Sequence, residues 1–294
     1  MNRRSFLKAT GAASILAPVL IREALSAQGQ STVAVAEGSD YPAITRKVIN
    51  AVGGMKRFVK PGDVVVVKPN IGWDRSPEQG ANTHPQVVRA IVEECLAAGA
   101  RKVKVFDSTC NDSRRCYVNS GIEAALKGIK HVECKQIETE RFRKVAINGQ
   151  VLKEWELYDE ALSANVYINV PVAKHHGLSK LTLGLKNIMG IMGGNRGSIH
   201  RNLDTALADV NAHFRTHLTI IDATRILTAH GPQGGNLADV KVLNKVIAST
   251  DTVAADAVVT TLFGLKPSDI PVTVAAHKRG LGEMDLSRIK VMKV

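Results

Sequence analysis

The chain has 294 residues, of which 45% are hydrophobic and 4% aromatic, and its formal net charge at pH 7 is +12. This length supports one large domain or two closely joined lobes. A basic chain often binds nucleic acid, but few aromatic residues are present to stack on bases, so we expect a small anionic molecule or an anionic surface as the partner. Lys and Arg spread over the surface for solubility are the alternative.

The first residues follow the pattern of a twin-arginine export signal. Residues 2–8 read N-R-R-S-F-L-K, residues 9–21 are apolar, and small residues at positions 24, 26 and 27 suit cleavage. We expect residues 1–27 to be a signal peptide that is read by the twin-arginine export machinery and sends the folded protein to the periplasm. Export also separates the mature chain from nucleic acid. The alternative is a short amphipathic helix with a basic start.

Residues 28–294 alternate short β-rich runs with helical patterns, and no further stretch is long and apolar enough to span a membrane. This alternation predicts a single α/β domain with a mostly parallel sheet and helices on both faces. The expected strands are Thr32–Ala36, Val64–Val67, Val103–Phe106, Val166–Val170, Leu218–Ile221, Val246–Ala248 and Ile289–Met292. The expected helices are Thr83–Ala98, capped by Thr83, Asn202–Phe214, and Asp251–Gly264, capped by Asp251.

The region 141–155 departs from the alternation. Its Asn148-Gly149 pair lies between the β-rich runs 145–147 and 151–152, which is typical of a β-hairpin. If the domain has two lobes, we expect the boundary between them at this hairpin.

Polar side chains follow the carboxyl ends of several expected strands, which is where open α/β sheets bind ligands. They are Lys68 and Asn70 after the second strand, Asp107 after the third, Lys174 and His176 after the fourth, and Asp222 after the fifth. Each residue alone is an ordinary cap or turn former. Their equivalent positions in successive strands predict one shared site.

The segment 171–202 holds the densest set of candidate functional residues. His176 and His200 can ligate a metal or move protons near neutral pH. Lys186, flanked by apolar residues, can lose its proton and become a nucleophile. Lys174, Asn187, Arg196 and the backbone N–H groups near Gly193 and Gly194 can hold an anion. The alternative is a mobile glycine-rich loop with solvated basic residues. In the next glycine-rich loop, His230 and the glycines after it can form a second wall of the site, and the alternative there is an ordinary turn.

Several of these motifs are similar to those of the domain-of-unknown-function family 362. The matching residues are Lys68-Pro69-Asn70, Thr83-His84-Pro85, Pro171–His176 and Lys186-Asn187. The resemblance covers nearly all of the mature chain. Members of that family often carry an added iron–sulfur module, but no cysteine here lies in a C-x-x-C arrangement, so we expect no iron–sulfur cluster.

The chain also resembles, more weakly, the nickel-dependent lactate racemase family. In that family a Lys ten residues after a His is tethered to a nickel-pincer cofactor, and another His follows. His176, Lys186 and His200 match this order. His84 stands where that family has an Arg, and Cys110 stands where it has a further His. The resemblance therefore implies a related metal or cofactor pocket with a different reaction.

The sequence as a whole predicts an exported enzyme that depends on a metal ion or metal-containing cofactor and acts on a small anionic substrate, as an isomerase or oxidoreductase. His176 and His200 are the expected metal ligands or acid–base groups, and Lys186 is expected to anchor a cofactor or bind an anion. The expected anion-binding residues are Lys68, Asn70, His84, Lys174, Asn187, Gly193, Gly194 and Arg196, with Asp107, Asp222 and His230 nearby. The alternatives are a periplasmic protein that binds a small anion or metal without catalysis, and an accessory of a partner enzyme.

Overall fold

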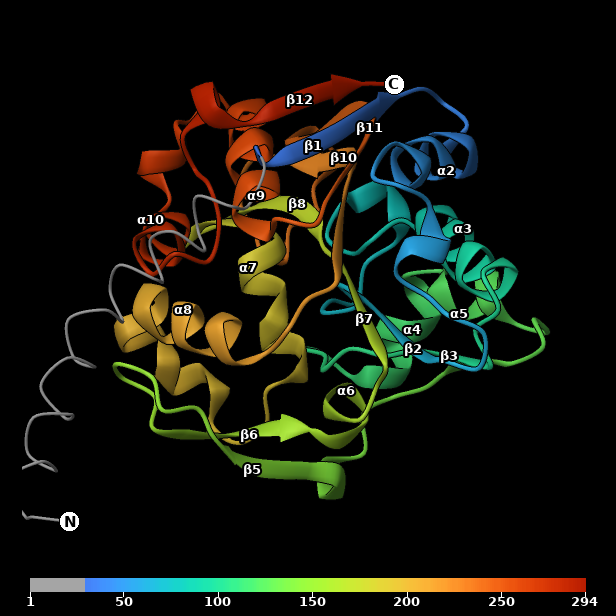
Figure 1. Cartoon of the computed structure of the whole chain (residues 1–294), viewed down its shortest axis with the longest axis horizontal. Coiled ribbons are helices and arrows are strands. Elements are labelled where there is room, and N and C mark those ends of the chain that lie inside the picture. Colours follow the sequence, from blue (N-terminus) through green and yellow to red (C-terminus); the bar gives the residue numbers. More distant parts are fainter. Residues whose placement is uncertain (1–29) are drawn as a thin grey trace, which may run out of the picture.

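The computed structural model describes residues 30–294, and the predicted signal peptide at residues 1–27 lies outside them. The described residues form an α/β fold (Figure 1). Its strands are β1 Thr32–Glu37, β2 Val64–Pro69, β3 Lys102–Val105, β4 Val132–Cys134, β5 Phe142–Ala146, β6 Glu154–Tyr158, β7 Val166–Val170, β8 Val172–His176, β9 Lys180–Thr182, β10 Leu218–Leu227, β11 Val240–Ser249 and β12 Lys290–Lys293. Its helices are α2 Tyr41–Ala51, α3 Pro85–Ala97, α4 Ser113–Asn119, α5 Ile122–Leu126, α6 Asp159–Leu162, α7 Gly184–Asn187, α8 Leu203–His213, α9 Thr252–Thr260 and α10 Pro271–Lys278.

Within residues 30–294, ten strands form one mixed sheet. Eight of them follow the order β12-β1-β11-β10-β7-β2-β3-β4, while β8 pairs with β10 and β9 pairs with β8. The pairs among β2, β3, β4 and β7 are parallel, as are those of β10 with β7 and β8 and of β1 with β12. Only β11 and β9 run antiparallel to their neighbours in this described sheet. The predicted mostly parallel sheet is confirmed.

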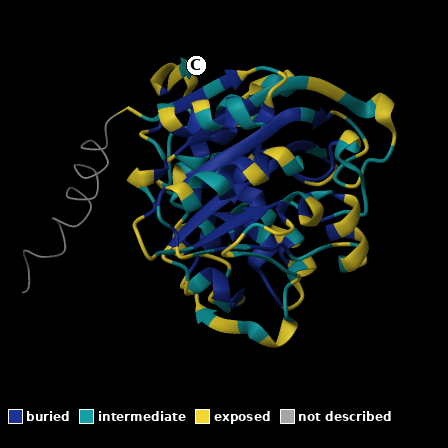
Figure 2. Cartoon of the chain, turned by 90° about the vertical axis from the view of Figure 1, so that its right-hand side faces the viewer, coloured by how far each residue is buried: buried dark blue, intermediate teal, exposed yellow. Residues whose placement is uncertain are grey.

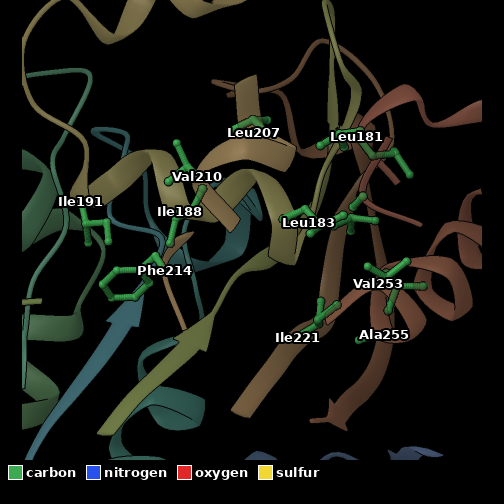
Figure 3. Close-up of a cluster of buried hydrophobic side chains, with 14 of the residues drawn as sticks. Leu181, Leu183, Ile188, Ile191, Leu207, Val210, Phe214, Ile221, Val253 and Ala255 are labelled. Atoms are coloured by element: carbon green, nitrogen blue, oxygen red, sulfur yellow. The ribbon is translucent and has the colours of Figure 1, made fainter. Parts of the chain in front are cut away.

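Helices cover both faces of the sheet, because its central strands are apolar on both sides. In β2, Val65 and Val67 join a core formed with α2 and α3, whereas Val66 joins the opposite core formed with α8, α9 and α10. Successive side chains of a strand point to opposite faces, which explains this division. Figure 2 shows the buried strands between helices whose outer residues are exposed, and Figure 3 shows Leu207, Val210 and Val253 in the second core.

Helix α3 begins one residue later than predicted, because His84 caps it in place of Thr83. The His84 Nδ1 atom accepts a hydrogen bond from the backbone N–H of Gln86 at 3.3 Å. The Thr83 hydroxyl is occupied elsewhere, since it donates to the carbonyl of Val170 at 2.7 Å and accepts from the N–H of Asn70 at 2.8 Å. Thr83 therefore ties α3 to the ends of β2 and β7.

The other two predicted helices are confirmed as α8 and α9. The Asp251 carboxylate accepts a hydrogen bond from the N–H of Ala254 at 2.9 Å and caps α9, as the sequence predicts. The helical segment then continues to Phe263 and ends at Gly264, whose φ of 72° is the left-handed conformation that glycine adopts without strain.

The predicted hairpin is confirmed as the antiparallel pair β5–β6, which forms a sheet of its own. Its paired strands lie farther from the turn than predicted, and the connection 147–153 also bonds to α8. The Asp209 carboxylate accepts from the N–H groups of Gln150, Val151 and Leu152. The main sheet takes strands from both sides of this hairpin. Residues 30–294 contain no helix with the length and apolar character of a membrane span.

Candidate functional site

A cavity of about 470 Å³ opens beside β8, beyond the carboxyl ends of β2 and β3. This volume lies in the usual range for a small-molecule site. Many of the residues predicted from the sequence line it, although they come from distant parts of the chain. They are Lys68, Asn70, Asp107, Lys174, His176, Lys186, Asn187, Arg196 and His200.

The alternation of β2 and β7 places two polar side chains on the face that holds the cavity. Lys68 lies two residues after Val66 and therefore shares its face, and the parallel register sets Lys68 opposite Asn169. Both contact Asn187 on α7: Lys68 Nζ donates to its Oδ1 at 2.8 Å, and its Nδ2 donates to Asn169 Oδ1 at 2.9 Å. The sheet register thus fixes the orientation of Asn187.

A chain of polar contacts, called here the polar chain, runs along the cavity floor through Asp107, Lys68, Asn187, Asn70 and Lys174. Lys68 Nζ lies 2.8 Å from Asp107 Oδ1. The Asn187 Oδ1 atom accepts from both Lys68 and, at 3.2 Å, the Asn70 amide. Lys174 Nζ donates to Asn70 Oδ1 at 3.1 Å. These bonds compensate part of the cost of burying two lysines.

Burial makes the lysine amines of the cavity unusually easy to deprotonate. Burial lowers the pKa of Lys68, while the neighbouring Asp107 carboxylate opposes this shift. Burial also lowers the pKa of Lys174 to about 7 and that of Lys186 to about 8, and the neighbouring cations add to both shifts. The site thus holds amines that change charge near neutral pH.

The short helix α7 presents Lys186 and Asn187 to the cavity. The Asp256 carboxylate of α9 accepts from the N–H groups of Gly184 at 2.7 Å and Leu185 at 2.9 Å, which anchors the start of α7. Burial raises the pKa of Asp256 to about 7. A Cβ atom on Gly184 would lie only 2.7 Å from Thr252 Cγ2, so this close packing requires glycine.

The backbone fixes the tautomer of His176. Its Nδ1 atom accepts hydrogen bonds from the N–H groups of Leu178 at 3.1 Å and Ser179 at 3.2 Å, in the turn between β8 and β9. A ring nitrogen that accepts carries no proton, so the proton of the neutral ring is on Nε2. Burial, and then the charge of Lys186, lower the pKa of His176 to about 3. His176 is therefore a neutral ring that donates from Nε2.

His200 has the opposite arrangement. Its Nδ1 atom lies 2.9 Å from the carbonyl oxygen of Gly197, which can only accept a hydrogen bond. Nδ1 therefore carries the proton, and Nε2 of the neutral ring has a free lone pair. The rings of His176 and His200 stack with their centroids 6.3 Å apart and their planes 14° from parallel. One ring of this pair has a donor at Nε2 and the other has an acceptor there.

Arg196 closes the cavity on the side of the loop after β3. Its guanidinium donates to the carbonyls of Ser108 at 3.0 Å and Thr109 at 2.7 Å. Arg196 therefore fixes this loop and adds a fourth basic group to the lysines of the cavity. Asp107 is the sole carboxylate among the lining residues. The resulting excess of positive charge favours an anionic ligand.

Sequence reasoning missed several residues of the lining, including Trp73, Met189 and Gly190. The Lys174 Nζ atom lies 5.9 Å from the centroid of the Trp73 ring, a cation–π contact. The position of Trp73 shortly after Asn70 at a strand end is the signal that could have identified it. Cys110 also lines the cavity, and all four cysteines of the chain are free thiols.

His84 and Asp222, both predicted for the site, lie outside the cavity lining. The Asp222 carboxylate accepts from the N–H of His84 at 2.7 Å, and the His84 ring packs against Tyr41 with the centroids 4.8 Å apart. Burial raises the pKa of Asp222. These contacts hold the start of α3 against β10 and α2.

Gly193 and Gly194 pack against the β5–β6 hairpin instead of facing the cavity. The Gly193 N–H donates to the carbonyl of Glu156 at 2.9 Å. A Cβ atom on Gly194 would lie 3.2 Å from a carboxylate oxygen of Glu156, and a carboxylate at this place disfavours an anion. The structure thus places Gly190 and Gly197, and not Gly193 and Gly194, in the lining of the cavity.

The exposed His230 also points away from the cavity. Its Nδ1 atom lies 2.9 Å from Asp239 Oδ2. The two residues that follow it, Gly231 and Pro232, do line the cavity. The predicted second wall is thus present, but it is built from these two neighbours of His230.

The protein side chains alone do not complete a metal site. Among the described residues, no three His, Cys, Asp or Glu side chains come together as ligands of a metal ion. A metal-binding His normally donates its other ring N–H to a partner, whereas Nδ1 of His176 accepts two hydrogen bonds. This donor set does not fit a metal ion held by His176 and His200.

Comparison with known proteins places the chain in a family without an assigned function. Residues 65–261 match the family model described as "Domain of unknown function (DUF362)". The chain is also 28% identical to the thylakoid-associated protein sll1697 of Synechocystis sp., over 83% of the chain and 77% of that protein.

Two solved structures are similar at low sequence identity. The lactate racemase apoprotein from Thermoanaerobacterium thermosaccharolyticum matches with a TM-score of 0.48 and 12% identity, over 80% of this chain and 57% of that one. A protein from Thermotoga maritima matches with a TM-score of 0.46 and 11% identity, over 78% of this chain and 60% of that one. The chain thus spans about three fifths of the length of these two structures.

Proposed function

The chain belongs to the DUF362 family of unknown function, and from this premise we propose that it is an enzyme of the isomerase type, which moves a proton on a small anionic substrate. The observation that carries the proposal is the pair His176 and His200, whose facing rings lie 6.3 Å apart and are held by the backbone in opposite tautomers. Such a pair offers one acceptor and one donor to a substrate bound beside it.

In this proposal His200 acts as the base. Its free Nε2 takes a proton from the carbon next to a carbonyl group of the substrate. His176 donates a hydrogen bond from Nε2 to the carbonyl oxygen as negative charge develops there. The lowered pKa of His176 keeps its ring neutral, so the ring polarises the carbonyl by donating a hydrogen bond and does not act as a strong acid. Return of the proton to another atom of the substrate completes an isomerisation.

The cationic residues of the cavity account for the choice of an anionic substrate. Lys174 and Lys186 are both buried, and the guanidinium of Arg196 lies beside them in the lining. Burying these cations costs free energy, and a bound carboxylate or phosphate lowers that cost. Trp73 adds a flat apolar wall against which the carbon skeleton of the substrate can pack.

A metal-containing cofactor remains a prediction of the sequence. Lys186 is the residue that would hold an organic cofactor, because it lines the cavity and its amine has no oxygen partner among the described residues. The described side chains do not supply the ligand set of a bare metal ion. The proposed proton transfer is therefore assigned to the protein groups.

The test is hydrogen–deuterium exchange at substrate carbon. The purified protein is incubated in deuterated water with a panel of small 2-oxo, 3-oxo and 2-hydroxy acids, and proton NMR follows the loss of the C–H signal next to the ketone carbon of the oxo acids or next to the carboxyl carbon of the hydroxy acids. We expect catalysed exchange for at least one member of the panel. Tight binding of these acids with no exchange for any of them would instead favour the non-catalytic binding protein, which needs the same cations but no acid–base pair.

We also propose that the protein works in the periplasm. Support comes from the order of residues 2–8, the apolar run 9–21 and the small residues at positions 24, 26 and 27, which together match a twin-arginine signal.

A further inference from the structure

Three buried lysines line the cavity, and they differ in what their amines contact. Lys68 and Lys174 donate to oxygen atoms of the polar chain. Lys186 is only 8% exposed, and the contact recorded for its Nζ is the thioether sulfur of Met189 at 3.3 Å. A thioether is a weak acceptor. Within the described residues, the Lys186 amine is thus buried without an oxygen partner.

The surroundings of Lys186 favour the neutral amine, which is the nucleophilic form. Burial, followed by the charges of Arg196 and Lys68, lowers its pKa to about 8. Roughly a tenth of the amine is then neutral at pH 7. A lysine in such a setting is a known type of nucleophile towards carbonyl carbon. The two other buried lysines are less suited to this role, because their amines are already engaged by oxygen acceptors.

We infer that Lys186 forms a covalent imine with the carbonyl carbon of a small oxo acid bound in this cavity. The inference rests on the proposed function and names its substrate class. The carbonyl group is required because an amine adds to it without a leaving group other than water. The acid group is required because Lys174 and Arg196 remain as cations that can hold it. An imine also increases the acidity of the adjacent C–H bond that His200 is proposed to deprotonate. In this covalent form the protonated C=N nitrogen accepts the electrons in place of the carbonyl oxygen, and the hydrogen bond from His176 acts on that oxygen in the earlier steps that form the imine.

His200, His176 and Lys186 account for every proton transfer in the formation of the imine, and the carbonyl oxygen leaves as water. His200 Nε2 takes one proton from the Lys186 ammonium, and the neutral amine forms a C–N bond as the carbonyl π electrons move to oxygen. His176 Nε2–H donates a hydrogen bond to that oxygen. A second proton moves from nitrogen to oxygen, and His200 returns the first one. The C–O bond then breaks, water leaves, and the lone pair of nitrogen forms the protonated C=N bond.

The experiment traps the imine by reduction. The full-length protein is treated with sodium borohydride in the presence of glyoxylate, pyruvate, 2-oxoglutarate or acetoacetate, and intact mass and peptide mapping locate the adduct. Lactate and succinate, which lack a ketone, serve as controls. We expect a reduced adduct on Lys186 with at least one oxo acid and none with the controls. Lys186→Arg, which keeps the positive charge, should lose the adduct, whereas the exposed control Lys180→Arg should keep it.

The outcomes separate this inference from the proposed function. Isotope exchange without any Lys186 adduct throughout the panel overturns the inference and leaves the acid–base proposal in place. An adduct confined to Lys68, Lys174 or surface lysines also overturns it. Absence of both exchange and adduct removes the inference together with the proposed function. Circular dichroism of Lys186→Arg shows whether that variant is folded. The peptide map of the wild-type protein locates any adduct directly, so it tests the imine even if the variant does not fold.

Discussion

His176 and His200 face each other as nearly parallel rings 6.3 Å apart, and the backbone groups that hold them are opposite in kind. Two N–H groups donate to Nδ1 of His176, and one carbonyl accepts from Nδ1 of His200. The ring that donates at Nε2 and the ring that accepts there are therefore set by the chain itself.

Replacement of His200 by Gln should remove the base while leaving the anion site intact. We expect the rate of hydrogen–deuterium exchange to fall by about 10²- to 10⁴-fold, the usual contribution of a general base, with little change in substrate affinity. NMR gives the rate, and isothermal titration calorimetry gives the affinity. The matched control is His213→Gln, at an exposed histidine that does not line the cavity. Equal rates in both variants would show that His200 is not the base.

Affinity for an anion without a ketone or aldehyde group, such as oxalate, should fall as the pH rises from 6 to 9. Lys174 and Lys186 have pKa values lowered to about 7 and about 8, so each amine is charged below its pKa and neutral above it. A bound anion stabilises the ammonium form and raises both values, which couples binding to proton uptake. Each lost charge should cost about 1.5–3 kcal/mol of binding free energy.

Calorimetric titrations at several pH values test this dependence. Lys174→Met should flatten the lower part of the pH profile, because the amine with the lower pKa is then missing. An affinity for oxalate that stays constant between pH 6 and 9 in the wild-type protein would contradict the assigned role of these lysines.

Substitution by alanine should lower the stability of the protein at one glycine of the cavity lining and leave it nearly unchanged at another. A Cβ atom on Gly190 would lie 1.8 Å from Asp107 Oδ1 and 2.3 Å from Lys68 Cε, whereas one on Gly177 meets no atom within 4 Å. Gly190→Ala must displace the buried ion pair, so we expect a loss of about 1–3 kcal/mol in the free energy of unfolding. Gly177→Ala should change it by less than about 0.5 kcal/mol. Urea denaturation measures both, and equal stabilities would refute the close packing.

Replacement of Arg3 and Arg4 by lysine should block export, because the twin-arginine pair is the part of the signal that the receptor reads. Cell fractionation and immunoblotting should find the wild-type protein in the periplasm and the variant in the cytoplasm as the uncleaved chain. Lys8→Arg, outside the arginine pair, is the control that should still be exported. Periplasmic recovery of the double variant would contradict the predicted route.

Much of the site could be predicted from the sequence, because strand alternation and strand ends are local patterns. The position of Lys68 two residues after Val66 sets its face, and the end of β2 just before Asn70 places both residues at the ligand-binding edge of the sheet. His176, Lys186 and His200 also stand in a segment whose composition is unusual. These residues meet in one cavity, as the sequence-based interpretation required.

The rest depends on tertiary contacts that the sequence does not display. Glycine content identified Gly193 and Gly194 as an anion cradle, but the sequence does not reveal that the Gly193 N–H is already bonded to Glu156. Likewise, Thr83 is a good cap by residue type, yet its hydroxyl is bonded to Val170 in another strand. The tautomers of the two histidines follow from loop backbone geometry, for which no sequence signal exists.

The most direct test of the central claim is NMR of the protein labelled with ¹⁵N-histidine, at a pH where both rings are neutral. Long-range ¹H–¹⁵N correlations identify which ring nitrogen carries the proton, and His176→Gln and His200→Gln assign the signals. We predict a proton on Nε2 of His176 and on Nδ1 of His200. Finding the same tautomer in both rings would contradict the donor–acceptor pair on which the proposed proton transfer depends.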